Sequence, residues 1–173
     1  MSVESIVIAT DLNKTFKAEQ KGLDDVQALQ GINMQIKAGQ LTALVGPDGA
    51  GKTTFLRLIA GLYKPTAGSL EILGMDVAKE TQSVQDRISY MPQKFGLYED
   101  LSIQENLDLY ADLHGVPMDV RKERFARLLK ITDLARFTER PAGKLSGGMK
   151  KKLGLVCTLV RSPELLLLDE PSV

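Results

Sequence analysis

The order of apolar and polar positions along the chain predicts strands alternating with helices. Short, compact apolar stretches indicate strands at residues 5–12, 40–45, 69–73, 87–91 and 165–168. Apolar residues spaced three or four positions apart indicate helices at residues 52–60, 102–114, 120–131 and 149–160. The polar stretch 17–27 predicts a loop. Alternation of this kind favours an α/β core.

Several elements carry signals at their ends. Ser102, with Glu105 three residues later, is typical of a capping box. Gly61 stands where a glycine commonly ends a helix. The leucine run at 165–168 is followed by two acids, which favours a strand buried on both faces. The helices between residues 94 and 160 indicate a helical lobe inserted between two strands of the core.

Composition excludes several classes of protein. The chain has 173 residues, 43% hydrophobic and 25% charged, so we expect one folded domain, with or without a small inserted lobe. Lys+Arg and Asp+Glu both number 22, which gives no overall attraction to nucleic acid. Cys157 is the single cysteine, so no internal disulfide can form. We expect neither a secretion signal at residues 1–5 nor a membrane-spanning helix at 153–168, where polar residues interrupt the apolar stretch.

Residues 46–53 match the phosphate-loop pattern G-x-x-x-x-G-K-[ST] in full, between a predicted strand and a predicted helix. Glycines allow backbone N–H groups to point at phosphate oxygens, and the helix N-terminus adds its positive dipole end. Lys52 would bind the β- and γ-phosphates, and Thr53 would bind Mg²⁺. A glycine-rich turn without a ligand is the alternative. The predicted nucleotide contacts are Gly46, Pro47, Asp48, Gly49, Ala50, Gly51, Lys52, Thr53 and Thr54.

A second candidate site follows the leucine run. Asp169 would hold Mg²⁺, and Glu170 would orient or deprotonate the attacking water. Acids at a solvent-exposed strand end are the plainer explanation of this pair alone. Together with the phosphate loop, the pair predicts a P-loop nucleotide hydrolase. Kinases, helicases and GTPases remain open at this point.

Residues 145–149, Leu-Ser-Gly-Gly-Met, resemble the signature motif of the ATP-binding cassette (ABC) transporter ATPases, with Met149 in place of the usual glutamine. Gln93 resembles the Q-loop glutamine of that family. Phe16 lies where the family places an aromatic residue that stacks on adenine. Residues 94–101 resemble the segment after the Q-loop in bacterial drug-exporter and ABC-2-type ATPases. The resemblance extends from about residue 5 to residue 173.

The resemblance implies a P-loop NTPase (RecA-like) core with an N-terminal antiparallel β subdomain and an inserted helical subdomain. It assigns residues 1–93 to the β subdomain and P-loop core, 94–160 to the helical subdomain, and 161–173 to the strand with the Walker B acids. The domain is expected to be incomplete, truncated after that strand. The aspartate-bearing loop and the switch histidine of the family lie further on, and His114 cannot be that histidine. We therefore expect the chain to bind ATP but to hydrolyse it weakly or not at all.

The family mechanism implies ATP and Mg²⁺ as cofactors. Its implied catalytic residues are Lys52, Gln93 and Glu170, and its implied metal ligands are Thr53, Gln93 and Asp169. A second ABC ATPase domain, identical or different, would face the first and present its Ser146, Gly147 and Gly148 to the nucleotide. Met149 cannot make the hydrogen bonds of a glutamine, so it would weaken the contact between the signature segment and the nucleotide. For at least two of Lys150, Lys151 and Lys152, a solvated helix face is expected.

The same resemblance implies a separate transmembrane permease as partner, with this chain peripheral on the cytoplasmic face of the inner membrane. It favours export as the direction of transport, and we expect no nucleic-acid partner. A soluble ABC ATPase that acts on ribosomes or DNA is the alternative. The remaining candidate residues have structural interpretations. Cys157 is expected in the core, His114 at a helix end, and Tyr63 and Tyr90 in packing contacts.

Overall fold

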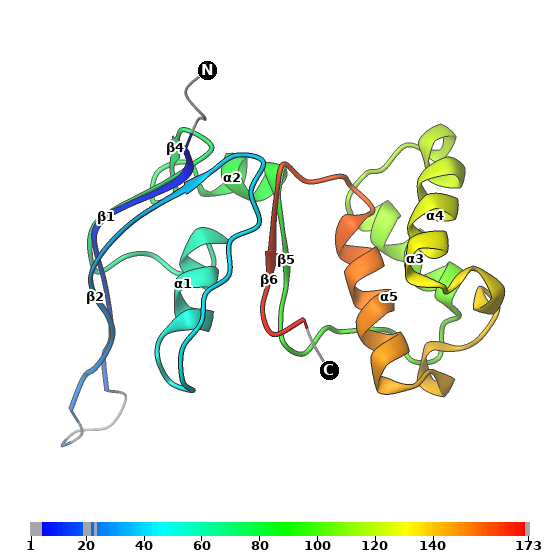
Figure 1. The fold of residues 1–173 in the computed structure, drawn as a ribbon, viewed down its shortest axis with the longest axis horizontal. Coiled ribbons are helices and arrows are strands. Elements are labelled where there is room, and N and C mark those ends of the chain that lie inside the picture. Colours follow the sequence, from blue (N-terminus) through cyan, green and yellow to red (C-terminus); the bar gives the residue numbers. More distant parts are fainter. Residues whose placement is uncertain (1–4, 19–21, 23, 172–173) are drawn as a thin grey trace. The chain divides into compact units, whose positions relative to one another are not determined.

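A computed structural model describes residues 5–18, 22 and 24–171. It divides the chain into two compact units, Met1–Arg87 and Ile88–Val173 (Figure 1). The expected loop at 17–27 lies partly outside the described residues, and so does the start of the chain.

The first unit is built on an antiparallel sheet with the strand order β2-β1-β3-β4. Its strands are β1 (Ser5–Phe16), β2 (Val26–Lys37), β3 (Ala67–Ile72) and β4 (Met75–Asp76). The helices α1 (Lys52–Ile59) and α2 (Thr81–Arg87) complete the unit. In the central strand β1, Val7, Ala9 and Leu12 are buried, and α1 buries Phe55, Leu58 and Ile59 at helical spacing. This sheet is the antiparallel β subdomain that the sequence predicted.

A bulge bends the middle of this sheet. The pairing of β1 with β3 shifts register between Thr10 and Asn13, and Asp11 adopts a φ of 45°. Gly68 of β3 approaches this bulge so closely that a Cβ there would lie 2.1 Å from the carbonyl oxygen of Asp11. Only a residue without a side chain allows this approach.

Residues 40–45 do not form the predicted strand. Among the described residues the stretch belongs to no ladder, and Leu41 and Val45 are 100% and 93% exposed. An apolar run forms a strand only where a neighbouring strand forms hydrogen bonds with its backbone. The local sequence pattern does not show whether such a neighbour is present. The expectation of a compact strand here was wrong.

The second unit joins a two-stranded parallel sheet to a group of helices. Strands β5 (Ile88–Met91) and β6 (Leu165–Leu168) pair in register from Ile88↔Leu165 to Met91↔Leu168. Leu167 is buried, but its three neighbours in β6 are half-buried. The expectation that this strand is buried on both faces was therefore wrong for the described residues.

The helical part of this unit packs around its own apolar core. Its elements are α3 (Ile103–Leu113), α4 (Met118–Thr132), α5 (Gly147–Leu159) and the 3₁₀ turns η1 (Ala135–Phe137) and η2 (Ala142–Lys144). Leu107, Phe125, Leu153 and Val156 lie in the centre, and Cys157 is fully buried among them, as predicted. None of the helices in the described ranges is both long and apolar enough to cross a membrane.

The predicted helix ends are confirmed. The Ser102 hydroxyl accepts a hydrogen bond from the backbone N–H of Glu105 at 3.2 Å, and the Glu105 carboxylate accepts one from the N–H of Ser102 at 2.7 Å. This reciprocal pair is a complete capping box at the start of α3. His114 caps the other end of α3, and Gly61 follows α1 with a φ of +66°.

Candidate nucleotide site

The phosphate loop of the first unit has the backbone conformation that its glycines predict. Gly49 and Gly51 have φ values of +78° and +86°, and α1 begins directly afterwards at Lys52. The ammonium group of Lys52 donates hydrogen bonds to the carbonyl oxygens of Gly46 and Pro47, both at 2.8 Å. The lysine thus spans its own loop and holds it in a curved shape.

The end of this loop lies against strand β2. A Cβ on Gly51 would lie 2.6 Å from the carbonyl oxygen of Ala28 and 2.7 Å from Leu29 Cδ2. A Cβ on Gly49 would meet nothing within 4 Å. The loop is therefore anchored at Gly51 and open at Gly49. Its exposed residues, which leave room for a ligand at the backbone, are Gly46, Pro47, Asp48, Gly49 and Ala50.

Thr53 and Thr54 follow Lys52 in the first turn of α1, and both are half-buried. A helix N-terminus favours an anion, and the Thr53 hydroxyl is an oxygen ligand of the kind Mg²⁺ prefers. The donor set of this loop thus fits a nucleotide phosphate with its metal ion.

Phe16 ends strand β1 in the same unit. Its ring packs edge-on against Tyr63, with 5.3 Å between ring centroids and an interplanar angle of 78°. The Lys14 ammonium lies 4.9 Å from the centroid of the Phe16 ring. Tyr63 is held in turn because its hydroxyl accepts a hydrogen bond from Arg57 Nη1 at 3.1 Å. Tyr63 is therefore a packing residue, as predicted, and it fixes the ring of Phe16.

The acidic pair of the second unit lies directly beyond β6. The Asp169 N–H donates to the carbonyl oxygen of Met91 at 3.0 Å, which extends the β5–β6 ladder by one residue. The Asp169 side chain is nearly buried, and its Oδ2 accepts a hydrogen bond from the Tyr90 hydroxyl at 2.9 Å. Glu170 is exposed and has a φ of +50°, a region that residues with a side chain seldom occupy.

Gln93 reaches the same place from β5. Its Nε2 donates a hydrogen bond to Glu170 Oε2 at 2.5 Å. The structure thus brings together Gln93, Asp169 and Glu170, three residues that the sequence assigned to one site. Tyr90 was expected only to pack. Its role as a partner of Asp169 could have been anticipated from the parallel pairing of the two strands, whose carboxyl ends meet at one edge.

The signature segment also has the predicted form. Ser146 is the N-cap of α5, and its hydroxyl accepts a hydrogen bond from the N–H of Met149 at 3.3 Å. Ser146 and Gly147 are exposed, so the helix N-terminus is accessible. Met149 is partly buried against the apolar core of the helical part.

The lysines after Met149 differ from the expectation. Lys150 forms an ion pair with Glu99 at 2.6 Å, and Lys151 donates to the carbonyl oxygen of Glu170 at 3.4 Å. Lys152 alone of the three is exposed. The prediction that at least two of them lie on a solvated face was wrong, because the segment after Gln93 and the turn at Glu170 both approach α5.

Phe95 provides a further link between the Gln93 segment and α5. A Cβ on Gly154 would lie 3.1 Å from Cγ of Phe95, so the ring rests directly on the helix backbone. A small cavity of about 110 Å³ lies beside this contact. It is lined by Met91, Gln93, Phe95, Leu97, Glu99, Lys150 and Lys151.

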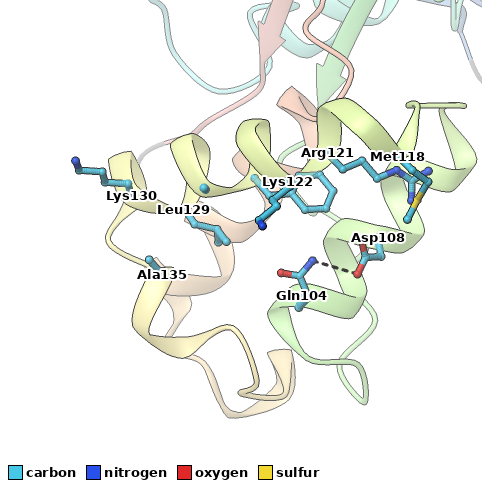
Figure 2. A pocket seen from close by; sticks show the side chains of 10 residues that line it. Gln104, Asp108, Met118, Arg121, Lys122, Leu129, Lys130 and Ala135 are labelled. Carbon is cyan, nitrogen blue, oxygen red and sulfur yellow. Dashed lines mark hydrogen bonds between the residues drawn. The ribbon is translucent and has the colours of Figure 1, made fainter.

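A larger groove lies between α3 and α4, with a volume of about 630 Å³ (Figure 2). Phe125, Leu129 and Met118 of α4 supply apolar lining. Gln104 and Asp108 of α3 form the facing side and are joined by a hydrogen bond of 3.1 Å. The sequence predicted helices at residues 102–114 and 120–131 but did not indicate a groove between them.

These features define a P-loop nucleotide-binding protein, because the loop conformation, the lysine and the helix N-terminus together make an anion site. The family comparison is more specific. The family model described as "ABC transporter" matches residues 29–173, and the chain belongs to this family.

Related proteins agree with this assignment. The chain is 52% identical over 170 residues to the probable multidrug ABC transporter ATP-binding protein YbhF of Escherichia coli K12. This match covers 98% of the chain and 28% of that protein. It is 36% identical over 158 residues to the daunorubicin resistance ATP-binding protein DrrA3 of Streptomyces coeruleorubidus, covering 91% of the chain and 50% of the relative. The chain thus spans between about a quarter and a half of the length of these relatives.

Solved structures confirm the fold. The ATP-binding subunit of an ABC transporter superposes with a TM-score of 0.82 at 29% identity, covering 97% of this chain and 67% of that one. A dimeric post-hydrolysis state of the ATP-binding cassette MJ0796, bound to ADP and Pi, gives a TM-score of 0.81 at 28% identity, with coverage of 96% and 74%. The predicted fold class, an ABC-type P-loop NTPase, is therefore confirmed.

Proposed function

We propose that this chain belongs to the ATPase of an ABC exporter, and that it binds ATP but hydrolyses it weakly or not at all. The phosphate loop is the observation that carries the proposal, since its two left-handed glycines and its lysine fit a triphosphate. Export is supported by the 52% identity to a probable multidrug transporter protein. Among the relatives, an iron import ATP-binding protein, FbpC of Mannheimia succiniciproducens, is 36% identical. The direction of transport therefore rests on the stronger similarity.

In this proposal the loop binds the phosphates through its backbone N–H groups. Lys52 exchanges its bonds to Gly46 and Pro47 for bonds to the β- and γ-phosphates, which are stronger acceptors because they are charged. Phe16 presents its ring to adenine, and Tyr63 holds that ring in place. The other proposed contacts are Asp48, Ala50, Thr53 and Thr54.

Mg²⁺ would be held by Thr53, Gln93 and Asp169, whose oxygen atoms suit a hard cation. When bound, the ion would neutralise charge on the phosphate oxygens. Glu170 would orient the attacking water and accept its proton. Since Gln93 donates to Glu170 in the structure, that bond would have to open before Glu170 could act as the base.

The signature segment would serve a second nucleotide-binding domain. Ser146, Gly147 and Gly148 lie at an accessible helix N-terminus, which favours a phosphate group. Met149 lacks the amide of a glutamine and is instead packed toward the core. We infer a head-to-tail pair of domains, identical or different, with one signature facing the other phosphate loop.

A transmembrane permease is the further proposed partner, and it would keep the chain at the cytoplasmic face of the inner membrane. The groove between α3 and α4 is a candidate surface for a cytoplasmic segment of that permease. Its lining also includes Lys122 and Lys130, which lie about 12 Å apart along α4 at 1.5 Å per residue. A helical segment with an apolar face and acidic residues two turns apart would match this groove in shape and charge.

The test is a thermal melt of the chain with and without Mg-ATP, beside Lys52→Ala. At a ligand concentration 100 times Kd, binding adds about 2.7 kcal/mol to the free energy of unfolding. The melting temperature should rise for the chain and stay unchanged for Lys52→Ala. Lys79→Ala is the matched control, because Lys79 is exposed and pairs only locally with Asp76. An equal rise in Lys52→Ala would contradict the proposal.

A further inference from the structure

We propose that Tyr90 is a positioning residue for Asp169: its hydroxyl sets the rotation of the carboxylate that receives the metal ion. This inference rests on the proposed function, in which Asp169 is a magnesium ligand. It adds a residue that lies outside the phosphate loop, the acidic pair and the signature segment.

The backbone around Asp169 is already fixed. Strand pairing places Met91 opposite Leu168, and the Asp169 N–H continues the ladder with its bond to the Met91 carbonyl oxygen at 3.0 Å. The main chain therefore determines where the Asp169 side chain begins. The direction of the carboxylate then depends on the rotations about the two side-chain bonds of the aspartate.

Tyr90 restricts that rotation. It stands on β5 opposite Leu167, and its hydroxyl donates a hydrogen bond to Asp169 Oδ2 at 2.9 Å. Asp169 is 4% exposed, so little water is available to replace this donor. A hydrogen bond from a neutral donor to a buried carboxylate is strong and directional.

The same bond also prepares the carboxylate for a cation. Partners of this kind, which bind a metal ligand rather than the metal, typically change metal affinity about 10-fold to 100-fold when they are removed. A rigid carboxylate loses less conformational freedom when the ion binds. Tyr90 is thus expected to act on metal-dependent nucleotide binding and to leave metal-independent binding alone.

This expectation separates positioning from packing. Tyr90→Phe keeps the ring and its packing and removes only the oxygen. If Tyr90 serves packing alone, loss of the oxygen leaves the metal dependence of nucleotide binding as it was. If Tyr90 orients Asp169, the metal dependence falls although the fold is retained.

The experiment measures the affinity of the chain for a non-hydrolysable ATP analogue by calorimetry, once with Mg²⁺ and once with EDTA. The ratio of the two affinities reports the contribution of the metal. We expect Tyr90→Phe to lower this ratio by about 10-fold or more, with unchanged affinity in EDTA. Repeating the titration with Mn²⁺ should give the same direction of change.

Tyr63→Phe is the matched control, since it also removes one tyrosine hydroxyl that makes a hydrogen bond. Because Tyr63 supports Phe16, its loss should change both affinities alike and leave the ratio intact. Asp169→Asn should abolish the effect of the metal. The positioning role would be overturned if Tyr90→Phe left the ratio of the Mg²⁺ and EDTA affinities unchanged while Asp169→Asn abolished the effect of Mg²⁺. The proposed function would still stand in that case. Full metal dependence in Asp169→Asn would instead refute the proposed function of that residue.

Discussion

Gln93 and Glu170 are joined by a hydrogen bond of 2.5 Å between the amide nitrogen of one and the carboxylate of the other. Each residue lies just beyond the carboxyl end of a strand, Gln93 after β5 and Glu170 after β6. Parallel pairing of the two strands is what brings them together. Glu170 also has a φ of 50°, a left-handed conformation that few residues with a side chain adopt.

Gln93→Glu should turn this attraction into repulsion. Two carboxylates at this distance destabilise the folded chain by up to about 1 kcal/mol, since both side chains are exposed and water screens them. The loss should appear in melts at low ionic strength and shrink in high salt, which screens exposed charges. Gln93→Met, which removes the donor without adding charge, should show no such recovery in high salt.

Gly51→Ala should damage the phosphate loop more than Gly49→Ala. Both positions have a positive φ, so each substitution incurs backbone strain of about 1–2 kcal/mol. At Gly51 the added Cβ would also collide with Ala28 and Leu29, whereas at Gly49 it meets open space. Denaturant unfolding of the two variants compares these costs directly. Equal losses would mean that contact with β2 does not anchor the loop.

The phosphate loop was predicted well because its information is local: glycines, a lysine and a following helix determine its shape within a few residues. The capping box at Ser102 was predicted for the same reason. Strand β2 was not predicted, because half of its residues are exposed, only Leu29 is buried, and Gly31 interrupts its alternation. The pairing that holds β2 comes from β1, and such long-range pairing leaves little trace in one sequence.

The capping box at α3 makes a prediction about pH. Hydrogen bonds from the Ser102 backbone N–H and then from its hydroxyl lower the pKa of Glu105 below its ordinary value of 4.5. A lowered pKa in the folded state stabilises the fold above pH 4.5, and this stabilisation is lost as the pH falls through the folded value. The melting temperatures of the chain and of Glu105→Ala should therefore differ at pH 7 and converge in acid.

Ser102→Ala removes the other half of the capping box and should cost about 1 kcal/mol at pH 7. Ser83→Ala, at an exposed position of α2, is the comparison variant and should be near neutral. A Ser102→Ala chain as stable as the original would show that other contacts hold the start of α3.

The Cys157 thiol should not react with thiol reagents in the folded chain. Its burial raises the pKa of the thiol, so the reactive thiolate is scarce at neutral pH. A thiol reagent such as DTNB at pH 8 should label the native chain only through unfolding, and label it at once in denaturant. Rapid labelling of the native chain would mean that the helical core opens readily.

Phe95 resting on Gly154 has a consequence for the way related sequences can differ. A larger residue at position 154 would push the ring away and with it the segment that carries Gln93, whereas a smaller residue at position 95 would leave a void over the helix. A change in residue size at only one of these two positions would therefore disrupt the packing of the ring on α5. In a set of homologous chains, these two positions should vary together, with large aromatic residues at one accompanied by glycine at the other.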